Sequence, residues 1–319
     1  MKKEFSICGL TIEAGRKVQD YVKILDTETR MPVTIINGKN EGKTILITAG
    51  IHGAEYPCIK TAIELAKEIK PEMVNGQIVI VHPVNMQAFE ARCAAIVPED
   101  NKNINRLFPG DKNGSISDKI AYVLTHEFQD KSDFYFDIHG GDLHEELHPY
   151  IYYPGACEKE ISEKSREVAS IFDVDYMVKS SATTGAYNSA AIRGIPCVLV
   201  ERGGAGFCRR DDVDKYKEDM FRALRVLGVL NGEYDKVEKT IVEIDNVKYI
   251  DSSKNGCIEM FVSAGDKVKK AQKLYSITDL FGNIIDTYNA EFNGVILYNT
   301  ISLAINEGES IIAYGELNN

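Results

Sequence analysis

Residues 43–69 read KTILITAGIHGAEYPCIKTAIELAKEI, and their pattern indicates the fold class. Its first part, 43–51, is a continuous apolar and β-branched run, which is typical of a strand covered on both faces. Its last part, 57–69, has apolar residues at helical spacing and begins with Pro57, which suits the first turn of a helix. A buried strand followed by a helix predicts an α/β sheet.

The same alternation continues along the chain. Buried strands are expected at 77–84, 133–139 and 195–204, and helices at 117–129, 158–172 and 212–230. Alternating strands and helices predict a central sheet flanked by helices. In such sheets ligands bind outside the carboxyl ends of the strands, which is where these runs end in polar residues and glycine.

The character of the sequence changes near residue 235. Residues 241–319 contain short alternating stretches with frequent Gly and Asn and no helical pattern, which indicates β-hairpins. We therefore predict an α/β domain over 1–235 and a small all-β domain over 236–319. The second resembles a barrel-sandwich hybrid of the biotinyl/lipoyl type, but its hairpin DTYNAEFNG lacks the lysine that a carrier function needs.

Composition excludes several classes of protein. The 319 residues carry a net charge of −11 without Lys/Arg clusters, so we expect neither nucleic acid nor a membrane as a partner. The first 17 residues lack the apolar core of a signal peptide, and no run reaches the ~18 apolar residues of a membrane helix. Seven scattered cysteines indicate reduced thiols and a cytoplasmic protein. A homo-oligomer is left open.

Residues 136–150, FDIHGGDLHEELHPY, contain a zincin-like H-E-x-x-H pattern. That pattern needs a helix, which would place His144 and His148 on one face, with Glu163 or Glu167 as a third ligand. The proline that follows disfavours a helical conformation at His148. We therefore expect both histidines to lie on a polar loop beside a cleft.

His139 ends a predicted buried strand, and His52 follows another, with Glu55 three residues further on. In a turn that leads into a helix, residues i and i+3 can converge. Two histidines and a glutamate are a ligand set of catalytic zinc sites that keep a fourth position open. The alternative is a strand-end histidine and a glutamate stabilised by the positive end of a helix.

Four ordered motifs, AGIHGAEYP, KNINRLFPG, FDIHGGD and IPCVLVERGG, resemble the succinylglutamate desuccinylase/aspartoacylase family, the deacylase branch of the zinc carboxypeptidase superfamily. The resemblance covers about residues 40–230 and implies a mixed central sheet of zinc carboxypeptidase type. It implies one Zn²⁺ per chain, and it assigns the following roles. His52, Glu55 and His139 bind the zinc, Asn105 and Arg106 bind a substrate carboxylate, and Glu201 is the general base and acid.

Residue chemistry agrees with these roles. Arg106 offers a planar fork for a carboxylate. Glu201 can take a proton from water and pass it to a leaving amine. Without the resemblance, Glu201 could equally be a strand-end carboxylate paired with Arg202, and Arg106 a surface residue of a loop. Asp137 shares one side of the strand with His139 and is expected to orient a ligand histidine.

One feature of aspartoacylase-type members is absent. They carry a further arginine shortly before the Asn-Arg pair, which helps to polarise the scissile carbonyl, whereas CAAIVPEDNK here contains none. The nearest arginine upstream is Arg92. Other sources of the missing cation are Arg193, Arg202, Arg209 and Arg210.

We therefore expect a zinc-dependent hydrolase that cleaves the amide bond of a small, carboxylated N-acyl amino acid or related N-acylated amine. The alternatives are a metallocarboxypeptidase acting on short peptides, an esterase, and a degenerate binding protein without metal. A β-domain narrows the mouth of the site in some family members, which weighs against a wide peptide groove. The complete His-Glu-His set together with Glu201 weighs against degeneracy.

Overall fold

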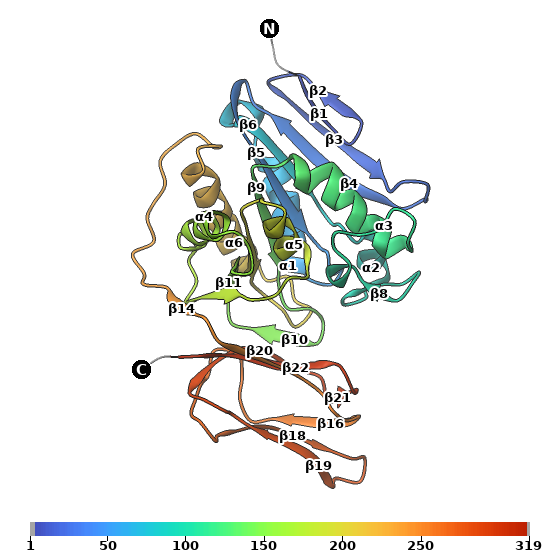
Figure 1. The fold of residues 1–319 in the computed structure, drawn as a ribbon, viewed down its shortest axis with the longest axis vertical. Coiled ribbons are helices and arrows are strands. Elements are labelled where there is room, and N and C mark those ends of the chain that lie inside the picture. The colour runs from blue at the N-terminus through green and yellow to red at the C-terminus, as the bar shows by residue number, and fades with distance from the viewer. Residues whose placement is uncertain (1–3, 318–319) are drawn as a thin grey trace.

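A computed structural model of the protein describes residues 4–317. Residues 1–3 and 318–319 lie outside the described residues. The first three belong to the segment in which no signal peptide is expected, and the last two belong to the predicted β-domain. Figure 1 shows an α/β body with a group of β-strands from the C-terminal part of the chain packed below it. Among the helices of residues 4–317, none combines the length and apolar character that a membrane crossing requires.

Within the described residues, the body is built on one nine-stranded sheet with the order β14-β12-β11-β13-β9-β5-β6-β4-β3. The four central strands β5, β6, β9 and β13 run parallel to one another. Strand β11 is antiparallel to β13, and β4 is antiparallel to both β3 and β6. The sheet is therefore mixed, as predicted. Its strands are β3 (Arg16–Lys23), β4 (Arg30–Asn37), β5 (Asn40–Ala49), β6 (Asn75–Val81), β9 (Phe134–His139), β11 (Tyr150–Pro154), β12 (Tyr176–Ser180), β13 (Cys197–Glu201) and β14 (Val242–Ile244).

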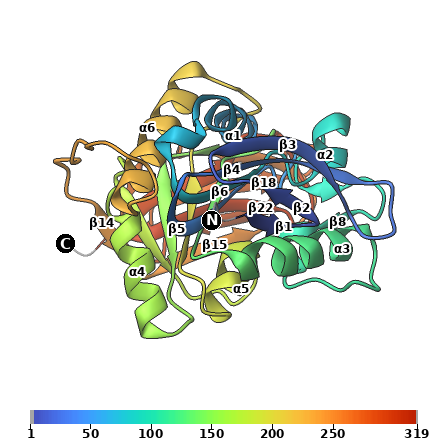
Figure 2. The same ribbon diagram turned by 90° about the horizontal axis from the view of Figure 1, so that it is seen from above.

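Helices cover both faces of this sheet. Alternate side chains of β5 enter different apolar cores. Ile45 and Ile47 pack in the cluster that contains Leu65 of α1 (Tyr56–Glu68). Leu46, which lies between them, packs in the cluster that contains Ile120 of α3 (Ile116–Val123). Figure 2 shows α1 and α6 (Arg210–Val226) on one side of the sheet, and α3 and α5 (Ala186–Ile192) on the other. Burial on both faces explains why the central strands are continuously apolar.

The predicted elements are present with shifted ends. The helices expected at 158–172 and 212–230 are α4 (Lys159–Ala169) and α6, and the helix expected at 117–129 is α3 followed by a π-helical turn, Leu124–Phe128. Several elements were not predicted from the sequence, among them β3, β4, β11, β12, α2 (Met86–Ala91) and α5. The outer strand β3 has polar and charged side chains at most positions, so it lacks the apolar run that identified the central strands.

The C-terminal strands enclose a third apolar cluster, which includes Leu274, Ile296 and Ile312. They form two sheets from β15 (Val247–Asp251), β16 (Gly256–Met260), β17 (Lys267–Val268), β18 (Lys273–Thr278), β19 (Ile284–Asn289), β20 (Gly294–Thr300), β21 (Ala304–Ile305) and β22 (Ser310–Glu316). Two short strands link these sheets to the body. β10 (Glu145–Leu147) pairs with β20, and β14 extends the main sheet beside β12. The division at 235/236 stays a proposal.

Two further hairpins lie at the periphery of the body. One is formed by β1 (Phe5–Ile7) and β2 (Leu10–Ile12), and the other by β7 (Ile96–Val97) and β8 (Lys102–Asn103). The second hairpin matters for the site, because its last strand, β8, consists of the first two residues of the KNINRLFPG motif.

Candidate metal centre and substrate site

Three parallel strands bring their carboxyl ends to one edge of the sheet, because β13, β9 and β5 are successive neighbours. His139 is the last residue of β9, and Glu201 is the last residue of β13. The two are register partners across the pair of strands. His52 follows the end of β5 in the turn that leads to α1. Parallel topology therefore assembles residues that are far apart in the chain.

The turn that carries His52 is tight and is covered by another helix. A Cβ atom on Gly53 would lie 2.4 Å from the backbone of Ala88 in α2, so glycine allows this close approach. Glu55 then occupies the position that precedes the first residue of α1. The turn places His52 Nδ1 2.6 Å from Glu55 Oε1. The i, i+3 convergence expected from the sequence is present.

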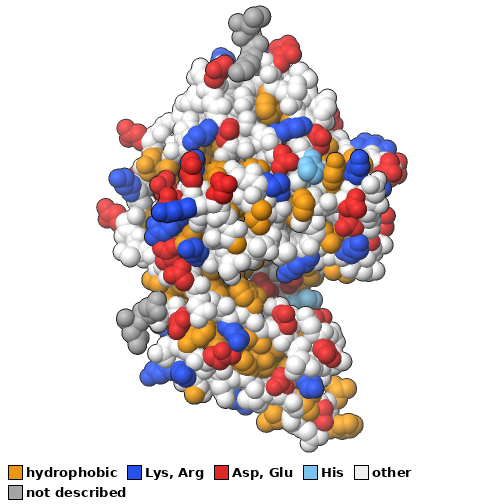
Figure 3. All heavy atoms as spheres, viewed as in Figure 1, with side chains coloured by type: hydrophobic (Ala, Val, Ile, Leu, Met, Phe, Trp, Pro, Cys, Tyr) orange, Lys and Arg blue, Asp and Glu red, His pale blue; other side chains and the backbone are white. Residues whose placement is uncertain are grey.

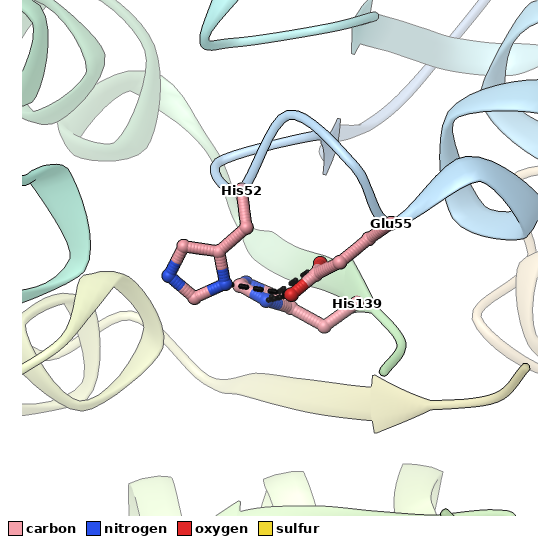
Figure 4. Close-up of side chains that lie close together, drawn as sticks. All are labelled: His52, Glu55 and His139. Atoms are coloured by element: carbon pink, nitrogen blue, oxygen red, sulfur yellow. Dashed lines mark hydrogen bonds and ion pairs between the residues drawn. The ribbon is translucent and has the colours of Figure 1, made fainter. Parts of the chain in front are cut away.

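His139 completes the cluster from the neighbouring strand. Its Nδ1 atom is 3.1 Å from Glu55 Oε2, and the ligand atoms of His52, Glu55 and His139 all lie within 4.8 Å of one another. Figure 4 shows both imidazole rings directed at the Glu55 carboxylate. Among residues 4–317 this is the one group of three or more His, Cys, Asp or Glu side chains with such spacing.

The outer nitrogen of each ring faces a further polar side chain. His52 Nε2 is 3.2 Å from Asn103 Oδ1, and His139 Nε2 is 3.2 Å from Asp137 Oδ1. Asp137 is fully buried and accepts a hydrogen bond from the Thr48 hydroxyl at 2.9 Å. Metal-binding histidines usually have such a partner at the second nitrogen, because it fixes the tautomer and the ring orientation.

The charges of the cluster favour a cation. Burial favours the neutral acid at Glu55, yet the charges of His139 and His52 hold the pKa of its carboxyl at about 2. At His139 burial favours the neutral ring, but Glu55 and Asp137 raise the pKa of the imidazole well above its usual value. Two buried carboxylates therefore attract positive charge to this point. A His₂Glu donor set with this charge suits a zinc ion.

Glu201 stands beside the cluster and has no ion-pair partner among residues 4–317. Its Oε2 atom is buried and has no hydrogen-bond partner among the described residues. Burial raises the pKa of its carboxyl to about 8, although His139 opposes the shift. The alternative pairing with Arg202 is wrong, because Arg202 is buried elsewhere and its Nη2 atom is 2.7 Å from Asp219 Oδ2. Successive residues of a strand point to opposite faces, which separates the two.

Tyr216 of α6 was not identified from the sequence. Its hydroxyl oxygen is 2.6 Å from the carbonyl oxygen of His139 and 2.7 Å from that of Val200. It therefore links the ends of β9 and β13 next to the cluster, donating its one proton to either carbonyl. A tyrosine on the apolar face of a helix gives no sequence signal beyond that of a core residue.

The KNINRLFPG motif lies against the same edge. Asn103, also missed, accepts a hydrogen bond from the backbone of Asn105 at 2.8 Å and contacts His52. Asn105 is buried in the 3₁₀ turn Ile104–Arg106, where its Oδ1 atom accepts from Ala186 N at 2.9 Å. Arg106 is exposed, and its guanidinium has no ion-pair partner among the described residues. The motif thus contacts the cluster through Asn103 and carries, three residues further on, a cation without an ion-pair partner among residues 4–317.

The other arginines considered as polarising residues are engaged elsewhere or exposed. Arg193 Nε is 2.8 Å from Asp130, and Arg210 Nη1 is 2.7 Å from Glu64. Arg202 pairs with Asp219, as described above. Arg92 is exposed at the end of α2, and Arg209 lies over the ring of Phe207. None of these contacts involves the His-Glu-His cluster.

The H-E-x-x-H segment is not a helix. Residues 145–147 form strand β10, where a polar loop was expected, because the edge of β20 offers backbone groups for pairing. His148 Nε2 is 2.6 Å from Asp175 Oδ2, and His144 is exposed. A strand directs alternate side chains to opposite faces, so it does not bring residues i and i+4 together as a helix does. The segment lacks zincin geometry.

The mixed sheet flanked by helices, with a His-Glu-His cluster at its strand ends, defines an α/β protein with a candidate metal centre. The chain belongs to the succinylglutamate desuccinylase/aspartoacylase family, since residues 41–227 match the sequence model of the succinylglutamate desuccinylase/aspartoacylase catalytic domain. It is 28% identical over 295 residues to the N-alpha-acetyl-L-2,4-diaminobutyric acid deacetylase of Halomonas elongata, covering 90% of this chain and 86% of the relative.

Solved structures have the same fold. The ectoine utilization protein EutE (DoeB) of Ruegeria pomeroyi, in a product-bound structure, superposes with a TM-score of 0.85 at 24% identity, covering 94% of this chain and 95% of that one. A succinylglutamate desuccinylase from a Silicibacter species has a TM-score of 0.80 at 25% identity, covering 91% and 89%. The C-terminal β-strands are therefore part of the shared architecture.

Proposed function

We propose that the protein is a zinc-dependent deacylase that hydrolyses the amide bond of a small N-acyl amino acid. The observation that carries the proposal is the convergence of His52, Glu55 and His139 beside Glu201, whose Oε2 atom has no hydrogen-bond partner among the described residues. Family membership supports amide hydrolysis, and the name of the Halomonas elongata relative supports an acylated amino acid as the substrate class.

The metal would be held by His52, Glu55 and His139. A zinc ion there would supply a Lewis acid that polarises a carbonyl group and makes water more acidic. The residues fit the ion because two imidazole nitrogens and a carboxylate converge, and because an oxygen of Asn103 and one of Asp137 lie 3.2 Å from the outer nitrogens of the two rings. A cytoplasmic location is part of the proposal, since all seven cysteines are free.

Glu201 is proposed as the proton carrier. A carboxyl group next to the scissile amide can accept a proton from the attacking water and donate it to the leaving amine. A pKa near 8, raised by burial, lets this group exchange protons at neutral pH. The free Oε2 atom leaves one oxygen available for that exchange.

Arg106 and Asn105 are proposed as the carboxylate receptor. The guanidinium of Arg106 is exposed and unpaired among the described residues, so a substrate carboxylate could bind it through two parallel hydrogen bonds. Asn105 is anchored through its Oδ1 atom, which orients the rest of its amide. Binding at this point would orient the acyl amide toward the cluster.

The C-terminal strands favour a small substrate. They contact the body on the side of Glu201, since Tyr249 of β15 places its hydroxyl 2.9 Å from that of Tyr152, and Tyr150 is the register partner of Glu201 in β11. Figure 3 shows the surface constricted between the body and these strands, with acidic and histidine side chains at the notch. C-terminal strands packed on this side would leave less room for a peptide than for an amino-acid derivative.

The test is a substrate screen on the purified protein with its metal content measured in parallel. N-acetyl and N-succinyl amino acids, dipeptides and acyl esters are compared at equal concentration. We expect the acyl amino acids to be hydrolysed fastest, and activity to be lost with a chelator and restored by zinc. Dipeptides cleaved faster than every acyl amino acid would instead favour a carboxypeptidase, and full activity in metal-free protein would refute zinc dependence.

A further inference from the structure

Thr48, Tyr135 and Asp137 lie together in the centre of the main sheet. Thr48 belongs to β5 and is the register partner of Asp137 in β9, and Tyr135 precedes Asp137 by two residues in the same strand. Side chains two residues apart point to the same face of a strand. All three residues are fully buried, although their neighbours in these strands are mostly apolar. Buried polar groups are costly unless they are hydrogen-bonded, so the bonds within this group decide what it can do.

The count of protons fixes the direction of these hydrogen bonds. The Thr48 hydroxyl donates to Asp137 Oδ1 at 2.9 Å, and a hydroxyl group has a single proton to donate. The hydroxyl oxygen of Tyr135 lies 2.7 Å from Thr48 Oγ1. Because the Thr48 proton is already engaged, Tyr135 is the donor in this second bond. The hydrogen bonds therefore run from Tyr135 to Thr48, and from Thr48 to the Asp137 carboxylate.

The Asp137 carboxylate lies next to the outer nitrogen of a candidate metal ligand. Its Oδ1 atom is 3.2 Å from His139 Nε2, whereas His139 Nδ1, on the inner side of the ring, is 3.1 Å from Glu55 Oε2. The Nε2 contact is close but not aligned as a hydrogen bond, and Nε2 and Asp137 Oδ2 are both buried without a hydrogen-bond partner among residues 4–317. A ring that binds a metal through Nδ1 carries its proton on Nε2, where Asp137 is the acceptor within reach.

We propose that Thr48 and Tyr135 are positioning residues of the metal centre, which hold the Asp137 carboxylate so that His139 keeps its proton on Nε2 and directs the lone pair of Nδ1 at the ion. The inference rests on the proposed function and deepens it. The terminal torsion of an aspartate is broad, so its carboxylate can turn unless a hydrogen bond restrains it. Thr48 supplies that restraint, and Tyr135 orients the Thr48 hydroxyl by donating to its oxygen. Neither residue belongs to the His-Glu-His cluster itself.

Zinc affinity tests the role of the two hydroxyl groups. Thr48→Val removes a hydroxyl and keeps the branched shape of the side chain, whereas Thr48→Ser keeps the hydroxyl. Competition with a chelator should show that Thr48→Val binds zinc at least about 10-fold more weakly than the wild type, the lower end of the loss when a partner of a metal ligand is removed. Thr48→Ser should retain the wild-type affinity. Tyr135→Phe should show a smaller loss than Thr48→Val, because Thr48 can still bond to Asp137 but its hydroxyl is no longer oriented.

Two buried residues offer matched controls. Thr125 is fully buried and its hydroxyl has no hydrogen-bond partner among the described residues, and Tyr275 is buried with a hydroxyl that has none within residues 4–317. Thr125→Val and Tyr275→Phe should therefore bind zinc as the wild type does. Equal zinc affinity in Thr48→Val and Thr125→Val, or equal losses in Thr48→Val and Thr48→Ser, would overturn the proposal. If Thr48→Val does not fold, the comparison of Tyr135→Phe with Tyr275→Phe decides in the same way.

Proton NMR of the zinc-loaded proteins reports the hydrogen bond itself. The Nε2 proton of His139, identified by its absence in His139→Gln, should resonate downfield in the wild type. It should move upfield in Thr48→Val and Tyr135→Phe but not in Thr125→Val, whereas a merely structural role would leave it in place. Unchanged shift and zinc affinity in Thr48→Val and Tyr135→Phe, in a protein that binds zinc and hydrolyses acyl amino acids, would refute the positioning role alone. A wild type that binds no zinc would refute the metal site and this inference together.

Discussion

Glu201 and His139 are register partners at the ends of the parallel strands β13 and β9. The hydroxyl of Tyr216 reaches backbone carbonyls on both strands at this point. The proposed proton carrier and a proposed metal ligand are thus held by one rigid unit of sheet and helix. Sites built on regular elements hold their geometry more closely than sites built on loops.

The metal content of histidine variants tests the assignment of ligands. The wild type should hold about one zinc per chain, and His139→Ala should lose it, because a His₂Glu site needs all three ligands. His148→Ala should keep the metal, since His148 pairs with Asp175 outside the cluster. Elemental analysis of the purified proteins measures both. Zinc retained in His139→Ala and lost in His148→Ala would restore the zincin interpretation.

Replacing Glu201 by Gln should lower kcat at least ~10²-fold, the usual contribution of a general acid-base, while the protein stays folded and keeps its zinc. Turnover, circular dichroism and metal analysis measure the three quantities. Glu259→Gln is the control, because Glu259 is an exposed glutamate of β16. Turnover close to that of the wild type in Glu201→Gln would remove this residue from the mechanism.

Replacing Tyr216 by Phe should reduce the free energy of unfolding by about 1–3 kcal/mol, because the one hydroxyl donor shared by two backbone carbonyls is lost. It should also weaken zinc binding, since one of these carbonyls belongs to His139. Denaturant titration and competition with a chelator measure the two effects. Tyr275→Phe is the control, because Tyr275 is buried and its hydroxyl has no hydrogen bond within residues 4–317. Equal zinc affinity in both variants would leave Tyr216 a purely structural residue.

Replacing Arg106 by Ala should strongly depress kcat/KM for a carboxylated substrate. Arg106→Lys should have a similarly low kcat/KM, because an ammonium group cannot replace the planar fork of the guanidinium. Kinetics with an uncharged amide analogue provide the second arm of a double-mutant cycle. The wild type should have a low kcat/KM for the analogue, and Arg106→Ala should lower that value little further, because the analogue already lacks the carboxylate that Arg106 would bind. Simple addition of the two losses would show that Arg106 does not bind the carboxylate.

The pH dependence of stability tests the environment of His82. Burial lowers the pKa of its ring to about 4 from a usual 6.5, and Nε2 lies 3.0 Å from the Thr34 hydroxyl oxygen. The unfolded chain therefore takes up a proton at a higher pH than the folded protein. The stabilisation linked to the neutral His82 ring is present above pH 6.5 and is lost as the pH falls through 4, by about 3 kcal/mol in all.

His82→Gln should remove this dependence. The loss of unfolding free energy between pH 7 and pH 5 should be smaller in this variant than in the wild type, by on the order of 1–2 kcal/mol. His144→Gln, which alters an exposed histidine, should behave like the wild type. Identical pH profiles for all three proteins would contradict the lowered pKa.

Local patterns predicted much of the framework. The apolar run at 43–51 predicted a strand buried on both faces, and Ile45, Leu46 and Ile47 alternate between two cores. The spacing of His52 and Glu55 predicted their convergence, because a turn into a helix has restricted geometry. Elements without a long apolar run, such as β3, β10 and α5, were not predicted. Their stability comes from the sheet or helices that they contact, which a local pattern does not show.

The sequence by itself therefore determined the alternation of strands and helices, the polar residues at the strand ends and the family motifs. Only the tertiary structure decided which of these residues meet. Asn103 contacts His52 across 51 positions of the chain, and Tyr216 reaches the carbonyl of His139 across 77. Such contacts depend on strand order and register, which local periodicity does not encode. Strand β10 likewise depends on its pairing with β20, because short strands are stabilised mainly by the partners they find.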